Sequence, residues 1–214
     1  MITGNRLVNW IYRGLEVFVK IAALNVMWMV FTVLGAGVLG FFPASAALLS
    51  VIRKWMMEGI DTSVPRTFFA SYKKEFVKAN VLGYAALLYG FVLFTNYQFM
   101  LSADGIVQLL IVIGLIILGT LFFLTVTFLF PAIVHFDLPV LKVVKVAFLF
   151  GMTHFYLAIL AGIGLTVTYH IVLFFPGIFM WFVPSLTGII LMPAAYKAFQ
   201  KFSRETTADE AVKV

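Results

Sequence analysis

The chain has 214 residues, of which 63% are hydrophobic and 11% are charged, whereas soluble domains average roughly 45–50% and about 25%. A water-soluble globule of this length could not bury so much apolar surface, so the composition predicts an integral membrane protein and excludes a cytosolic enzyme, a free nucleic-acid-binding domain and a disordered tail. The 15 Lys and Arg residues outnumber the nine Asp and Glu residues, as expected when basic residues are retained in short cytoplasmic loops.

The first 20 residues carry a polar stripe at helical spacing, which is typical of an amphipathic helix. The stripe consists of Arg6, Asn9, Arg13, Glu16 and Lys20. Such a helix lies either on the membrane surface or at the wet beginning of the first span.

An apolar stretch over residues 21–52 is too long for one straight span and short for two. Gly35, Gly37 and Gly40 lie in its middle, and Pro43 follows them. Because proline is tolerated in the first turn of a helix but disrupts its interior, we predict a span over residues 18–39 and a short half-helix over residues 43–57. Residues 21–57 then form a hairpin or a re-entrant unit, and one long crossing is the alternative.

The segment from Arg53 to Asn80 is polar and holds six of the basic residues. Within it, Phe68, Tyr72 and Phe76 recur every four residues beside lysines. This spacing predicts an interfacial helix over residues 64–79, with its aromatic side chains in lipid and its lysines toward anionic headgroups.

Four further spans are predicted over residues 81–101, 106–134, 148–175 and 178–198, and the last is expected to bend at Pro184. Turns at Asp104 and Pro176 and a polar elbow over residues 135–145 separate them. Residues 201–214 form a charged tail that is expected to fray. The predicted fold is therefore an all-α, polytopic transmembrane helical bundle, a single domain over residues 1–200 with about five full spans, the half-helix and interfacial amphipathic helices.

The basic residues predict the orientation of this bundle. Three lie before residue 21, six in the 53–80 segment, two in the elbow and four in the tail, whereas the two turns have none. If residues 21–57 form a hairpin, all 15 lie on one side, which the positive-inside rule makes the cytoplasm. We therefore expect a multi-pass protein of the bacterial cytoplasmic membrane with both termini cytoplasmic.

Several polar residues are candidate contacts for a partner or a solute. Asn25 lies inside the first span, where an interhelical hydrogen bond is its simplest role. Arg53, Lys54 and Trp55 are typical of an interfacial anchor or of a docking surface. His135 and Asp137 could contact a cytosolic partner, or Asp137 could cap the helix that follows Pro139. The complete candidate set is Asn25, Arg53, Lys54, Trp55, Asn80, His135 and Asp137.

A motif of two apolar residues, Pro and Ala occurs three times, around Pro43, Pro131 and Pro193. Such sites are either broken helices that line a transport site or kinks accommodated by packing, and we favour the second interpretation. Motifs of hydrolases, metalloproteases and P-loop enzymes are absent from the sequence, the three histidines are scattered, and cysteine is absent. We expect no enzymatic activity, no metal site and no cofactor.

Several short signatures occur in a fixed order along nearly the whole chain: FFPASAALLSVIRKW, Phe68, Tyr72-Lys73, Phe76-Val77-Lys78, Asn80, Gly83, FPAIVHFD, Lys142, Lys145 and Ala147. In these signatures the chain resembles the YesL-like family, bacterial integral membrane proteins catalogued as a domain of unknown function. His135 stands where many relatives are expected to have arginine. Family members are often encoded beside sugar-uptake transporters and polysaccharide-degrading enzymes, so the resemblance implies a role in carbohydrate utilisation.

The sequence and the resemblance together lead to two expectations. The first is a non-enzymatic accessory or regulatory component of carbohydrate uptake, with anionic lipid headgroups, a sugar-uptake transporter complex or a second copy of the chain as partners and no nucleic acid. The second is a stand-alone transporter of small solutes, with a polar cavity reached by Asn25, Thr32 and Asn96.

Overall fold

A computed structural model describes residues 6–175 and 182–212 of the chain. In these ranges all regular structure is helical: α1 (Arg6–Leu34), α2 (Val38–Glu58), α3 (Val64–Ser102), α4 (Gly105–His135), α5 (Val140–Thr153), α6 (Phe155–Phe174) and α8 (Val183–Val212). The predicted all-α fold is confirmed. Helices α1, α2, α3, α4 and α6 are long and apolar enough to cross a membrane, which indicates a multi-pass membrane protein.

Helices α1 and α2 form an antiparallel hairpin. A three-residue turn over residues 35–37 joins them, with Ala36 and Gly37 at positive φ. Across the hairpin, the Trp28 indole donates a hydrogen bond to Ser45 Oγ (3.1 Å), and near its open end Lys20 donates to the Ile60 carbonyl (2.9 Å). The helices are so close at the turn that a Cβ on Gly40 would lie 2.4 Å from a backbone oxygen of α1.

Helix α2 differs from the predicted half-helix. It begins at Val38, has 21 residues and contains Pro43 in its interior, whereas the prediction began the helix at this proline. In its most apolar 18-residue stretch, 56% of the residues are buried inside the protein, against 6–22% for the corresponding stretches of the other membrane-length helices. α2 is therefore the central helix, and α1, α3, α4 and α8 pack against it.

Helix α3 unites two predicted elements, because it continues for 39 residues through the interfacial segment and the following span. The expectation that its early aromatic side chains face lipid is wrong. Phe68 is fully buried, and the Tyr72 ring lies 4.9 Å from that of Phe31. The connection over residues 59–63 turns the first half of α3 back onto the α1–α2 hairpin, so this aromatic face becomes part of the core.

The predicted span over residues 148–175 is divided at His154, whose backbone (φ −121°, ψ 39°) is not helical. Helix α5 precedes this residue and helix α6 follows it. Next to the break, α5 lies so near α4 that a Cβ on Gly151 would be 2.6 Å from the Leu124 carbonyl oxygen. This contact holds α5 against α4, and α6 then leaves in another direction.

The predicted turn at Pro176 and the first residues of the predicted span over residues 178–198 lie outside the described residues. Helix α8 begins at Val183, so Pro184 lies in its first turn, where proline fits, and not at a bend. α8 continues to Val212 and so includes residues 201–212 of the predicted tail.

The three proline motifs converge on the core and lie inside continuous helices, so the interpretation as broken helices is wrong. Pro43 and Pro131 are fully buried. The preceding Phe42 and Phe130 rings stack with their centroids 5.9 Å apart, and Phe130 packs against each of the three groups of core side chains. Small alanines after the prolines let α2, α4 and α8 approach closely.

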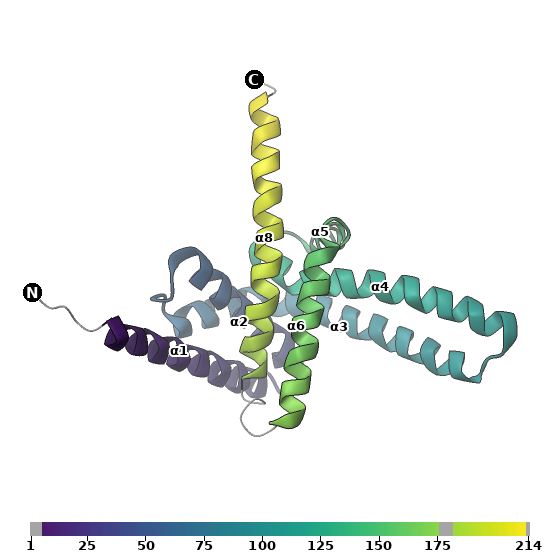
Figure 1. Cartoon of the computed structure of the whole chain (residues 1–214), viewed down its shortest axis with the longest axis horizontal. Coiled ribbons are helices and arrows are strands. Elements are labelled where there is room, and N and C mark those ends of the chain that lie inside the picture. The colour runs from purple at the N-terminus through teal and green to yellow at the C-terminus, as the bar shows by residue number, and fades with distance from the viewer. Residues whose placement is uncertain (1–5, 176–181, 213–214) are drawn as a thin grey trace, which may run out of the picture.

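From this core the helices extend in different directions (Figure 1). The α3–α4 hairpin projects to one side and α1 to the other, while α6 and α8 run beside each other across them. The outer half of the hairpin carries exposed Leu88, Phe91 and Ile116, as expected for a surface in contact with lipid.

Candidate functional site

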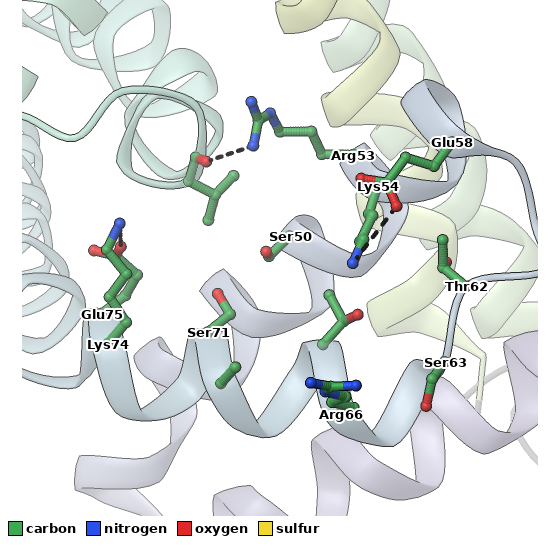
Figure 2. A pocket seen from close by; sticks show the side chains of 13 residues that line it. Ser50, Arg53, Lys54, Glu58, Thr62, Ser63, Arg66, Ser71, Lys74 and Glu75 are labelled. Carbon is green, nitrogen blue, oxygen red and sulfur yellow. Dashed lines mark hydrogen bonds and ion pairs between the residues drawn. The ribbon is translucent and has the colours of Figure 1, made fainter.

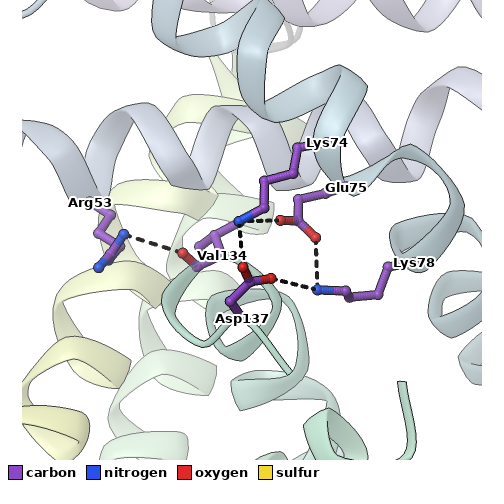
Figure 3. A network of polar contacts seen from close by, with 6 residues as sticks. All are labelled: Arg53, Lys74, Glu75, Lys78, Val134 and Asp137. Carbon is purple, nitrogen blue, oxygen red and sulfur yellow. Dashed lines mark hydrogen bonds and ion pairs between the residues drawn. The ribbon is translucent and has the colours of Figure 1, made fainter. Parts of the chain in front are cut away.

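A cluster of charged side chains lies where the second half of α2, the first half of α3 and the α4–α5 connection meet. We call this cluster the charged end. Its members are Arg53, Lys54, Arg66, Lys74, Glu75, Lys78, His135 and Asp137, and Figure 3 shows five of them with their contacts. The cluster brings together four of the seven predicted site residues: Arg53, Lys54, His135 and Asp137.

Arg53 joins α2 to the end of α4. Its Nε donates a hydrogen bond to His135 Nδ1 (3.1 Å) and its Nη1 donates to the Val134 carbonyl (3.3 Å). The last carbonyls of a helix lack intrahelical donors, so Arg53 satisfies one of them. The His135 ring also packs against Phe199, with 4.8 Å between ring centroids. Arg53 and His135, 82 positions apart in the sequence, therefore fix α2 relative to α4.

Two lysines and two carboxylates form a network beside this pair (Figure 3). Glu75 is 5% exposed and lies 3.1 Å from Lys78 and 3.8 Å from Lys74. Asp137, on the α4–α5 connection, lies 3.2 Å from Lys74 and 4.0 Å from Lys78. α5 begins after Pro139 without a side-chain cap, so the predicted capping role of Asp137 is wrong. Its carboxylate binds the lysines of α3 instead.

A cavity of about 570 Å³ opens at the charged end, between α2 and α3. Figure 2 shows Lys54 and Glu58 on the α2 wall and Arg66, Ser71 and Lys74 on the α3 wall. Lys54 and Glu58 form an ion pair (3.6 Å) in which both side chains remain partly exposed. The cavity is therefore polar and accessible, and it is bounded by residues from three elements.

Trp55 does not serve as the predicted interfacial anchor. Its side chain packs against the core group around α2, and its indole nitrogen is buried without a hydrogen-bond partner among the described residues. The adjacent Arg53 and Lys54 line the cavity instead. Of these three neighbouring side chains, two therefore belong to the charged end and one to the core.

Asn25 and Asn80 lie away from the charged end and connect helices. Asn25 is 3% exposed, and its Oδ1 accepts the backbone amide of Ser185 in the first turn of α8 (3.2 Å). This geometry confirms the expected interhelical hydrogen bond. Asn80 donates to the carbonyls of Leu39 and Phe76 (both 3.0 Å). Both asparagines therefore have structural partners.

The sequence interpretation missed Arg66, Lys74, Glu75 and Lys78 as site residues. The available signal was the Lys-Lys-Glu run with Lys78 three residues after Glu75, because that spacing places a carboxylate and an ammonium on one helix face. The predicted role of these lysines is to contact anionic lipid headgroups. That role does not require a buried acidic side chain, so it gives no reason to select Glu75.

A second cavity, of about 310 Å³, lies among the membrane-length helices and is mainly apolar. Trp28, Phe42, Phe130 and Leu191 contribute to its lining. Across the described residues, no group of three histidine or acidic side chains is placed to hold a metal ion. Of these two cavities, the one at the charged end is the one lined mainly by polar side chains.

Comparison with known proteins places these features in a family. The sequence profile of the family described as "Protein of unknown function, DUF624" matches residues 21–97. The Bacillus subtilis (strain 168) protein named "Uncharacterized protein YesV" is 34% identical over 191 residues, which cover 89% of this chain and 92% of YesV. The chain belongs to the YesL-like family of unknown function. The predicted resemblance is therefore confirmed.

Two further relatives from the same organism cover most of the chain. "Uncharacterized protein YteU" is 32% identical over 88% of this chain and 85% of its own length. "Uncharacterized protein YesL" is 27% identical over 97% of this chain and 94% of its own length. No solved structure is similar enough to count as a match. The similarity of the YesL-like relatives extends over the helices that build the charged end.

Proposed function

We propose that this YesL-like protein is a non-enzymatic accessory or regulatory subunit of a carbohydrate-uptake system in the bacterial cytoplasmic membrane. The charged end is the surface that contacts the partner. The link to carbohydrate comes from the family resemblance, whereas the docking role is supported by the geometry of the charged end.

The observation that carries the proposal is that hydrogen bonds and ion pairs join three elements into this polar surface. Arg53 holds α2 to α4 through two hydrogen bonds, and Lys74 connects α3 to Asp137 on the next connection. A surface whose side chains are already positioned loses less conformational entropy when a partner binds. Its mixed charges also provide specific pairing and orientation.

The orientation proposed for the protein places this surface in the cytoplasm. All basic residues of the sequence belong to segments on one side if α1 and α2 both cross the membrane. The turn over residues 35–37 and the turn at Asp104 then lie outside. Both termini and the charged end face the cytosol, where an accessory subunit can contact the cytosolic parts of a transporter.

A photo-crosslinking experiment in native membranes tests this proposal. A photoreactive amino acid replaces the exposed Lys73, beside the charged end, and a matched control replaces the exposed Phe94 on the outer part of α3. We expect the Lys73 position to yield a crosslink that mass spectrometry identifies as a sugar-transporter component, and the Phe94 position to yield none. Identical products at both positions, or none from a transporter, would contradict the proposal.

A flux assay separates this proposal from a stand-alone transporter. The purified full chain is reconstituted into liposomes, and uptake of radiolabelled sugars is measured. We expect no flux above that of empty liposomes, since Asn25 is engaged with α8 and the exposed Asn96 donates to its own helix. Saturable sugar uptake by the chain alone would contradict the accessory function and show that the protein is itself a transporter.

A further inference from the structure

The cavity at the charged end has the composition of a site for a phosphate group. Its volume of about 570 Å³ lies within the range of about 300–1,000 Å³ that is usual for small-molecule sites. Four basic and two acidic side chains line it, together with five hydroxyl groups: Arg53, Lys54, Arg66, Lys74; Glu58, Glu75; Ser50, Thr62, Ser63, Thr67 and Ser71. The lining therefore carries a net positive charge and many groups that can donate hydrogen bonds.

The acidic side chains of the cavity are already paired. Glu75 is held at 3.1 Å by Lys78, which lies outside the lining, and Glu58 is held by Lys54. The Lys54–Glu58 pair is 39% and 55% exposed, and such exposed pairs contribute only about 0–1 kcal/mol. Lys54 can therefore exchange this partner for a more highly charged anion.

Arg66 is the basic side chain most available to a ligand. It takes part in none of the ion pairs that the described residues form. Arginine binds phosphate through two parallel N–H groups. Arg53 contributes as well, because a guanidinium has five N–H donors and the contacts to His135 and Val134 use two of them.

The beginning of α3 adds backbone donors and a buried hydroxyl. α3 starts at Val64 without a side-chain cap from Ser63, so the amides of Val64 and Arg66 have no partner within the helix. Such amides, with the helix dipole, favour anions. Thr62 lines the cavity, and its Oγ1 has no hydrogen-bond partner in the described part of the chain. Because this oxygen is shielded from solvent, it can donate to a ligand only after the side chain rotates.

We infer that this cavity binds a phosphate group, held by Arg66 and Lys54 on opposite walls and located beside the N-terminal end of α3 (Figure 2). The group belongs either to a soluble phosphate compound or to an anionic phospholipid headgroup. This inference rests on the proposed function, because the ligand would occupy the surface that contacts the partner and would control that contact.

Binding is tested with the purified full chain in nanodiscs. Inorganic phosphate is titrated into phosphatidylcholine nanodiscs and followed by calorimetry, and phosphatidylglycerol is added to parallel nanodiscs and followed by ³¹P NMR. The test variant is the double substitution Lys54→Gln/Arg66→Gln. The control is Lys142→Gln/Lys145→Gln, which removes the same charge from two exposed positions on α5. Arg66→Lys keeps the charge but not the paired donors.

We expect at least a tenfold loss of affinity in the test variant, an unchanged affinity in the control and an intermediate value for Arg66→Lys. Binding of inorganic phosphate identifies a soluble ligand, and an effect confined to phosphatidylglycerol identifies a headgroup. Equal affinities in the test and control variants, or no binding of either probe, overturn the inference.

The unfolding midpoint without ligand shows that the variants are folded. Because partner contact is measured separately by the Lys73 crosslink, failure of phosphate binding and failure of the proposed function are distinguishable.

Discussion

The Asn80 side chain donates a hydrogen bond to the carbonyl of Leu39, at 3.0 Å. Leu39 lies four residues before Pro43, and Pro43 has no amide hydrogen with which to bond this carbonyl. The asparagine of α3 therefore supplies the donor that the proline removes from α2. This relationship explains how the central helix keeps a proline in its interior, and it gives Asn80 a structural role.

Replacement of Asn80 by leucine is expected to lower the free energy of unfolding by about 1–3 kcal/mol, because the Leu39 carbonyl is left without this donor. In a Pro43→Ala background the cost should be smaller, since an amide at position 43 can donate to the same carbonyl. Unfolding midpoints in detergent measure both effects. The control is Asn96→Leu, because the Asn96 amide donates only to Val92 in its own helix. If Asn80→Leu lowered the free energy of unfolding equally with Pro43 present and in the Pro43→Ala background, Asn80 would not be replacing the donor that the proline lacks.

Substitution of Asn25 by leucine should also destabilise the protein by about 1–3 kcal/mol. The change leaves the Ser185 amide unpaired in a fully buried position, and α8 then loses this hydrogen bond to α1. The matched control is Thr166→Val, since the Thr166 hydroxyl is exposed and donates to Gly162 within its own helix. Hydrogen exchange at the start of α8 should increase in the Asn25 variant alone. Unchanged exchange there would show that the contact does not hold α8.

The carboxylates of the charged end should differ in their contribution to stability. Glu75 is 5% exposed between two lysines, so Glu75→Gln leaves the shielded Lys78 with only its 4.0 Å contact to the exposed Asp137 and should cost up to about 3–5 kcal/mol. Asp137 is 78% exposed, and Asp137→Asn should cost about 1 kcal/mol or less. Thermal unfolding at 0.05 M and about 1 M salt compares them. The Asp137 effect should disappear at high salt, where screening acts over about 3 Å. A larger loss for Asp137→Asn would refute this order.

The sequence predicts features that depend on local residue patterns. It does not predict the contacts between segments that are distant in the chain. The all-helical fold and the need of Asn25 for a hydrogen bond follow from apolar composition and from the cost of an unpaired amide in a membrane. The identity of its partner, the Ser185 amide, depends on how α1 and α8 pack. The break at His154 has no proline or other local signal and arises beside the close contact between Gly151 and Leu124.

The charged end shows the same limit. Arg53 and His135 were each selected for their residue type and position, but their contact across 82 residues was not predictable from one chain. Glu75 was overlooked because a glutamate in a lysine-rich polar segment is normally exposed. Glu75 is buried because the first half of α3 packs against α2 and the α4–α5 connection. The spacing of residues within α3 alone does not predict this packing.

The absence of cysteine from the chain permits a direct test of the proposed orientation. Single cysteines are introduced at five positions and treated on intact cells with a membrane-impermeant thiol reagent: Gly4, Ala36, Ser63, Asp104 and Thr206. We expect labelling at Ala36 and Asp104, because the turn between α1 and α2 and the turn between α3 and α4 lie outside. The other three positions should label only after the cells are permeabilised, which is the control for reactivity. Labelling at Gly4 but not at Ala36 would mean that the α1–α2 hairpin does not return to the cytoplasm, and the orientation proposed for the charged end would have to be abandoned.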